Sequence, residues 1–257
     1  MAGETEKCRA TCLGIRPWSR TSHVVSWLTP CGVVGTVVKG AVRPKSQFLG
    51  QYDLNYSCEI VYYARSSQGL HALRECFPLD MREALRGDYR ALLAAEHMRA
   101  TCAELAPSGP DGEKWLSLLE RSLDAAAKPG ELVEKLLRFE LEVLDLAGLK
   151  PDFSGYDRTA EWSEFGVESG RFRAAADMAG ETDDAGGPAG RRIRVPRQTA
   201  CWLCGEGHEK NTEVLLDAAR VIGVFYQFHL GRVSEARRTA LMVVSKPKRQ
   251  KNEHEDQ

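Results

Sequence analysis

The alternation of side chains in residues 52–63, YDLNYSCEIVYY, decides how the first part of the chain folds. Apolar or aromatic side chains occupy every second position from Tyr52 to Tyr62, and polar side chains such as Asp53 and Glu59 lie between them. A period of two puts these two sets on opposite faces of a β-strand. The stretch therefore predicts a strand with one face in a core and the other in water.

Four further short strands are expected around this one, because runs rich in Val, Ile and Tyr are separated by turn residues. They span residues 8–16, 22–29, 32–39 and 69–77, and Pro30 to Gly32 form a tight turn between the second run and the third. Five short strands that close on themselves predict an OB-fold barrel over residues 1–80, a fold that commonly binds oligonucleotides. An SH3-like barrel would give nearly the same pattern.

After Pro78 the apolar period becomes that of helices. Helices are expected over residues 81–105, over the segment that Pro129 and Gly130 close, and over residues 131–147, which together predict a helical bundle over residues 81–151. The expected buried residues are Leu85, Tyr89, Leu92, Leu93 and Met98 in the first helix, Trp115, Leu118, Leu119 and Leu123 in the second, and Val133, Leu137, Leu141 and Leu144 in the third.

Residues 152–210 are acidic and rich in glycine, and the run 181–190, ETDDAGGPAG, has too little apolar surface to fold by itself. We expect an irregular insertion there. A last helix starts near Asn211 or Thr212, either of which can cap it, and the segment 211–244 is expected to pack on the bundle. Residues 245–257 are polar and are expected to be disordered. The predicted fold class is α+β, an N-terminal OB-fold barrel followed by a helical bundle with an irregular insertion like a vestigial zinc finger.

The charge is distributed unevenly along the chain, although the formal net charge is −1. Lys and Arg outnumber Asp and Glu by 9 to 6 in residues 1–80 and by 13 to 8 in residues 191–257, whereas acidic residues prevail by 13 to 10 in residues 81–150 and by 9 to 3 in residues 151–190. Both ends are basic and the middle is acidic. Such segregation allows a nearly neutral protein to bind a polyanion on one face.

The beginning of the chain, MAGETEK, does not have the pattern of a secretory signal. The most apolar stretch, residues 24–38, is interrupted by Ser26, Thr29 and Pro30 and is too short to span a bilayer as a helix. We therefore expect a cytoplasmic protein without a membrane role, in which most of the eight cysteines are buried thiols.

Three strings resemble the RecO family and occur in the order and on the elements expected for it. Residues 39–48, KGAVRPKSQF, are similar to the family's KGARRPKSKF, and residues 136–153, LLRFELEVLDLAGLKPDF, are similar to RFELRLLxLLGLAPDL. Residues 229–232, HLGR, followed by Arg237 and Arg238, are similar to HLGRxLKSRR. The resemblance covers about residues 9–244.

The resemblance implies a bacterial mediator of DNA repair and homologous recombination that is not an enzyme. Such a protein binds single-stranded and double-stranded DNA, anneals complementary strands, and works in the RecF pathway in association with the nucleoid. The implied protein partners are RecR, with which it loads the recombinase RecA, and the acidic C-terminal tail of single-strand-binding protein, which a groove of the helical bundle would hold.

The loop that carries Lys39, Arg43 and Lys45 is the first candidate for DNA contact, because three cations within seven residues beside a barrel edge can follow successive phosphates. Phe48 would add a stacking surface. Arg16 and Arg20 add to the charge of the same domain. The alternative is a solvated loop whose aromatic residue packs in the core.

A second set of candidate DNA contacts, Arg232, Arg237 and Arg238, follows the last helix, although cations at that place also stabilise a helix C-terminus. The basic stretch 191–197 receives less weight, since it follows an acidic segment with which it can pair.

Cys201, Cys204 and His208 form half of a zinc site, because two thiolates two residues apart can bind one side of a tetrahedral ion. Many RecO-like proteins carry a second cysteine pair in this region, but residues 152–172 contain no cysteine, and Cys8 and Cys12 belong to a barrel strand. We therefore expect two thiols without a metal or other cofactor.

No sequence motif of a nucleotide-binding loop, a serine hydrolase or a zinc protease is present. The pattern favours a binding protein. The alternatives are an OB-fold RNA-binding protein of translation or RNA processing, a hydrolase whose carboxylates have no recognisable motif, and a scaffold that binds only proteins.

Overall fold

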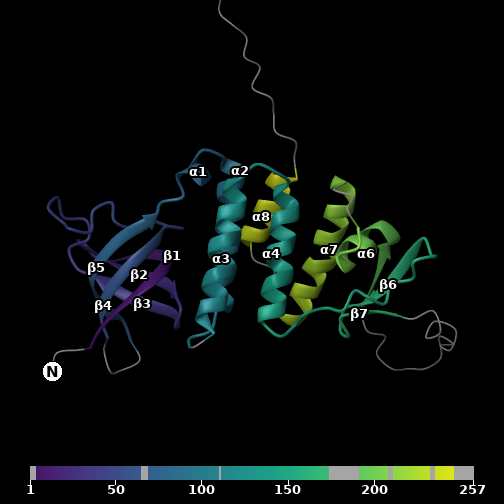
Figure 1. The fold of residues 1–257 in the computed structure, drawn as a ribbon, viewed down its shortest axis with the longest axis horizontal. Coiled ribbons are helices and arrows are strands. Elements are labelled where there is room, and N and C mark those ends of the chain that lie inside the picture. The colour runs from purple at the N-terminus through teal and green to yellow at the C-terminus, as the bar shows by residue number, and fades with distance from the viewer. Residues whose placement is uncertain are drawn as a thin grey trace, which may run out of the picture.

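The computed structural model describes residues 4–64, 69–109, 111–173, 191–207, 211–231 and 235–245. A barrel lies at one end of the molecule, a layer of helices occupies the middle, and a small sheet lies at the other end (Figure 1).

The first part of the chain forms a closed barrel with the strand order β1-β2-β3-β5-β4. Its strands are β1 (Thr5–Ser19), β2 (Ser22–Thr29), β3 (Gly32–Val38), β4 (Ser57–Tyr63) and β5 (His71–Asp80). The pairing of β3 with β5 is parallel, and all the other pairings are antiparallel. This confirms the predicted five-stranded barrel, including the turn at Pro30 and Cys31 that joins β2 to β3.

The strand predicted over residues 52–63 is correct only in its second half. Cys58, Ile60 and Tyr62 point into the barrel as expected, but β4 begins at Ser57. Asn55 before it has the left-handed φ of 67°, so the chain cannot continue as a strand there. Residues 39–56 instead form a loop that packs Phe48, Tyr52 and Tyr56 against the barrel core.

Six helices of the described chain form the middle layer: α1 (Glu83–Arg86), α2 (Tyr89–Leu105), α3 (Gly112–Ala127), α4 (Leu132–Leu146), α7 (Thr212–His229) and α8 (Glu235–Val244). The predicted second and third helices are confirmed. Asn211 caps α7 by accepting a hydrogen bond from the backbone of Glu213, as expected. No helix in the described ranges is both long and apolar enough to cross a membrane.

One predicted helix is divided in two, and one helix was not predicted. The helix expected over residues 81–105 is interrupted at Gly87, and Asp88 caps α2 through the backbone of Arg90. The buried face of α2 differs from the predicted one: Tyr89 and Leu92 are exposed, and small residues such as Ala94 and Ala95 are buried. The last predicted helix ends before Gly231, which has a φ of 77°, as expected, and the unpredicted helix α8 follows it within the segment 211–244.

The region predicted to be an irregular insertion contains regular structure. Strands β6 (Trp162–Gly166), β7 (Arg171–Phe172) and β8 (Arg192–Pro196) form a sheet in the order β7-β6-β8, followed by α6 (Arg197–Cys204). Phe153, Phe165 and Phe172 cluster on its inner face, and the ring of Phe165 lies 6.1 Å from that of Phe225 on α7. This aromatic contact supplies the core that the sequence pattern did not indicate. The acidic run 181–190 lies outside the described residues.

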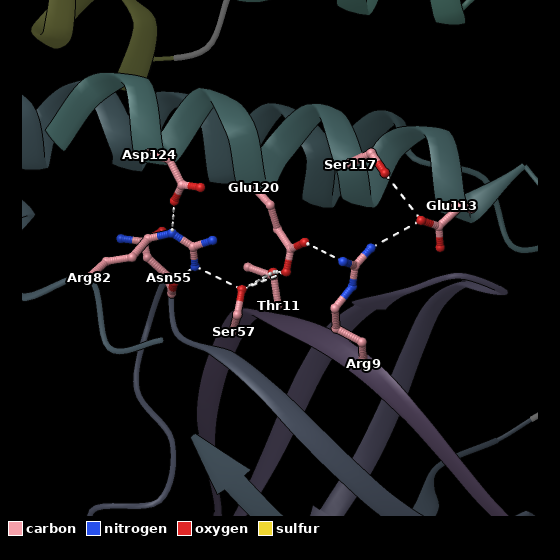
Figure 2. Close-up of polar contacts among 9 residues, drawn as sticks. All are labelled: Arg9, Thr11, Asn55, Ser57, Arg82, Glu113, Ser117, Glu120 and Asp124. Carbon is pink, nitrogen blue, oxygen red and sulfur yellow. Dashed lines mark hydrogen bonds and ion pairs between the residues drawn. The ribbon is translucent and has the colours of Figure 1, made fainter. Parts of the chain in front are cut away.

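A network of polar side chains joins the barrel to α3 (Figure 2). Arg82, whose side chain is buried, donates from Nη1 to the carbonyl oxygen of Asn55 at 2.7 Å and to Oγ of Ser57 at 2.9 Å, and from Nε to Asp124 at 2.9 Å. Glu120 of α3 accepts hydrogen bonds from Ser57 at 2.5 Å and from Thr11 at 3.1 Å.

The same helix touches the barrel again at its first turn. Arg9 of β1 pairs with Glu113 at 3.0 Å and with Glu120 at 3.4 Å. A Cβ atom at Gly112 would lie 2.0 Å from the backbone nitrogen of Gly32 in the β2–β3 turn, so only glycine allows this approach. The barrel is therefore fixed along most of the length of α3.

The helices are held together by a buried charge cluster. Arg237 of α8 donates to both carboxylate oxygens of Glu140 on α4, at 2.7 and 2.9 Å, and His97 of α2 lies 2.8 Å from the same carboxylate. Burial by itself raises the pKa of Glu140, but the Arg237 charge and the His97 contact lower it more, to about 2. Glu140 therefore stays ionised in the folded protein down to strongly acidic pH.

We predict that this cluster makes stability depend on pH below about 4.5. Because the folded pKa of Glu140 lies below its ordinary value of 4.5, its contribution is complete above that pH and is lost as the pH falls toward 2. Glu140→Gln leaves Arg237 without a counter-charge and should lower the free energy of unfolding at pH 7 by about 3–5 kcal/mol. Urea denaturation at pH 7 and pH 3.5 measures both effects.

The control is Glu142→Gln, which removes an exposed carboxylate of the same helix that pairs with Arg121. It should change stability by less than about 1 kcal/mol. Equal stability of wild type and Glu140→Gln at pH 7 would contradict the structural role of the cluster.

Candidate nucleic-acid interface

The β1–β2 turn and the loop after β3 lie side by side at one end of the barrel. The backbone nitrogen of Val42 donates to the carbonyl oxygen of Thr21 at 3.3 Å, and that of Gly40 donates to Oγ of Ser22 at 3.2 Å. Successive turns, closed by hydrogen bonds from Arg43 to Gly40 and from Ser46 to Arg43, shape the loop. These contacts place the cations of two separate segments at one edge, which we call the barrel edge.

Five of the predicted contact residues lie in these two segments or, for Arg16, in the end of β1 before the turn, and all five are exposed: Arg16, Arg20, Lys39, Arg43 and Lys45. Within the described ranges none of them forms an ion pair with a carboxylate. The sequence contains a reason that our sequence analysis missed: there is no Asp or Glu between Glu6 and Asp53. The barrel edge therefore carries positive charge with no acidic residue of its own segments to neutralise it.

Phe48 was predicted to be a stacking surface, and that prediction was wrong. Its side chain is buried, with 7% of the residue exposed, in the same core cluster as Val25, Trp27 and Tyr56. The alternative in which the loop is solvated and its aromatic residue packs in the core describes Phe48 correctly.

Trp18 provides an exposed aromatic surface that Phe48 does not. It is 62% exposed and lies between Arg16 and Arg20 at the end of β1. The register of β1 against β2 shifts between Pro17 and Ser19, which leaves Trp18 without a partner on β2. Such a bulge redirects a side chain out of the regular pleat. An exposed indole among cations can stack on a base while its neighbours contact phosphates.

The arginines after the last predicted helix do not join the barrel edge. Arg232 lies outside the described residues. Arg237 is buried and forms an ion pair with Glu140. Its prediction as a DNA contact was therefore wrong, because its charge neutralises a buried carboxylate. Arg238 is exposed and pairs with Glu235 of its own helix at 2.6 Å.

Of the residues predicted to form half of a zinc site, Cys201 and Cys204 lie in the described chain, on α6. Tyr156 and Arg158 lie beside the pair and bind the carboxylate of Glu206, at 2.8 and 3.2 Å respectively. Burial and the Glu206 charge raise the pKa of the Cys204 thiol. His208 lies outside the described residues. Among the described residues no three His, Cys, Asp or Glu side chains are placed to hold a metal ion.

Comparison with known proteins identifies one family. Residues 86–238, from the end of α1 into α8, match the family described as recombination protein O C terminal. This match covers more than half of the chain and begins after the barrel. No curated protein matches the chain.

We predict that Trp18→Ala weakens the binding of a single-stranded oligonucleotide by roughly 1–3 kcal/mol, or about 5- to 150-fold, because one stacked base is lost. Fluorescence anisotropy at constant salt measures the change. Phe77→Ala is the control, because Phe77 is also an exposed aromatic residue, 51% exposed, but lies elsewhere on the barrel. Phe77 of β5 is opposite Glu59 of β4, and Glu59 is opposite Arg9, which lies nine residues before Trp18 on β1. Equal losses in both variants would contradict a specific role for Trp18.

Proposed function

Because the chain belongs to the recombination protein O (RecO) family, whose role is in DNA recombination and repair, we propose that it binds single-stranded DNA at the barrel edge and anneals complementary strands. The single observation that carries this proposal is the group of five exposed cations at the barrel edge, which form no ion pair within the described residues and two of which flank the exposed Trp18. A single strand needs these two features, cations for its phosphates and an aromatic surface for a base.

The proposed mechanism is physical and involves no covalent step. Cations of the barrel edge that replace the counterions of a strand reduce the repulsion between its phosphates and those of a second strand. A strand held by its backbone keeps the pairing edges of most bases free. A complementary strand can then pair with it, and the bound protein lowers the electrostatic cost of the encounter.

The wider pathway is also part of the proposal. As a RecO protein the chain would bind double-stranded DNA less selectively through the same cations, and it would pair with RecR to load RecA in the RecF pathway. It would be recruited to coated DNA through the acidic C-terminal tail of single-strand-binding protein. Annealing of DNA coated with the cognate single-strand-binding protein tests recruitment and annealing together.

An OB-fold RNA-binding protein would have a similar barrel and a similar cationic edge. The family match over residues 86–238 favours DNA repair. Competition between single-stranded DNA and RNA of equal length and sequence decides between the two. Preferential binding of RNA would overturn the proposed function.

We predict that K39Q/R43Q/K45Q makes the fall of log affinity with log salt less steep by about 2, because each phosphate contact on a single strand contributes ~0.7 to the steepness. Affinity at moderate salt should fall by at least about 10-fold, and annealing should slow with it. The matched control is K114Q/R121Q/K150Q, which removes three exposed cations that already pair with carboxylates. An unchanged slope in the barrel variant, or an equal change in the control, would show that the barrel edge is not the site.

A further inference from the structure

The outer face of the small sheet carries a second group of cations. In β8 the residues alternate, so that Ile193 and Val195 are buried and Arg192 and Arg194 are exposed. Across the sheet Arg192 is opposite Gly166 of β6, and Gly166 is in turn opposite Arg171 of β7. Because opposite residues share a face, the three arginines point the same way.

Trp162 of β6 belongs to the same face. It is opposite Pro196, and the guanidinium of Arg194 lies over its ring, 4.3 Å from the centroid. Glu164 is the carboxylate of this face and is opposite Arg194, yet within the described ranges Arg194 forms no ion pair and stacks on the indole. We call Trp162, Arg171, Arg192 and Arg194 the arginine face.

The charge of the arginine face is only partly compensated. Arg171 is exposed, and its nearest paired carboxylate, Asp152, is 3.9 Å away. Arg220 of α7 donates to the carbonyl oxygen of Arg194 at 3.0 Å, which brings a fourth cation to the edge of the face beside its own partner Asp217 at 3.6 Å. An anionic ligand can therefore compete with the long Arg171–Asp152 pair and approach Arg194, which forms no ion pair within the described residues, at little cost.

The arrangement suits a single-stranded polyanion with bases. Arg192 and Arg194 are two residues apart on a strand, about 6.6 Å, which is comparable to the spacing of successive phosphates in an extended single strand. The indole of Trp162, already covered by a guanidinium, offers an edge or a face for a base next to these phosphates. Residues 191–197 received little weight from the sequence because they follow an acidic segment with which they can pair; the structure adds that Arg192 and Arg194 share one face with Trp162.

We propose that the arginine face is a second binding surface for single-stranded DNA, so that one molecule can hold two strands at once. This inference rests on the proposed function, because the first strand is the one at the barrel edge. It adds a place for the second strand, which annealing requires.

The positions of the two surfaces support simultaneous binding. The barrel and the small sheet lie at opposite ends of the molecule, with α3, α4 and α7 side by side between them (Figure 1). Three helices packed at ~8–10 Å spacing keep the surfaces at least about 20 Å apart. This is more than twice the Debye length of ~8 Å at physiological salt, so the two bound strands repel each other weakly. Both strands nevertheless stay at a high effective concentration.

The test measures how many oligothymidine strands bind per chain. Oligothymidine does not pair with itself, so a second bound strand must contact protein. Titration of short fluorescent oligothymidine against full-length protein, with the oligomeric state fixed by analytical ultracentrifugation, should give two strands per chain for wild type. R171Q/R192Q/R194Q should give one strand per chain and should lower the annealing rate by at least about 10-fold at unchanged occupancy of the barrel edge.

Two further variants make the result specific. R192K/R194K keeps the charge and should retain two strands per chain, whereas K114Q/R121Q/K150Q removes the same charge elsewhere and should also retain two. Circular dichroism melting confirms that each variant is folded.

Each outcome has one meaning. If R171Q/R192Q/R194Q still binds two strands per chain, or if wild type binds only one, the arginine face is not a second site, while the barrel edge stands as long as K39Q/R43Q/K45Q loses affinity. If K39Q/R43Q/K45Q keeps full affinity and stoichiometry, the proposed function fails at the barrel edge.

Discussion

The contact between α3 and the barrel is the constraint on which the rest of the structure depends. Arg82 is a buried cation with a left-handed backbone conformation. Its guanidinium is stable there because Asp124, Ser57 and the carbonyl oxygen of Asn55 accept hydrogen bonds from it. A buried charge without such partners would cost several kcal/mol. At the first turn Gly112 permits a backbone approach that no larger residue allows. The barrel therefore has one orientation on the helices.

A fixed orientation matters because the functional surfaces lie at the ends of the molecule. The helices between them carry mostly paired surface charges, such as Lys114 with Asp111 and Arg121 with Glu142. Exposed cations that form no ion pair within the described residues lie at the barrel edge, and further exposed arginines lie on the other side of the helices, at the arginine face. A nearly neutral protein thus presents two positive ends, and the charge inside the helical layer serves stability through Glu140 and Arg237.

Features set by short local patterns could be predicted from the sequence. Features that depend on contacts between residues far apart in the sequence could not. The barrel strands, the turn at Pro30 and the cap at Asn211 follow from short patterns and are present. Phe48 was predicted to be a stacking surface and Trp18 was not considered, because alternation cannot locate a bulge or show which aromatic residue packs in the barrel core. Arg237 looked like a surface cation, since its partner Glu140 is 97 positions away. The small sheet was missed because its core depends on Phe225 of a later helix.

The most direct test of the central claim is to map where a single strand touches the protein. An oligonucleotide that carries a photoreactive thymidine analogue is cross-linked to full-length protein at low occupancy, and the modified peptides are identified by mass spectrometry. The account predicts cross-links first to the segments around Trp18 and Arg43, which carry the exposed indole and the loop cations and are joined by the hydrogen bond from Val42 to Thr21. Cross-links confined to the helices, with none at the barrel edge, would contradict it.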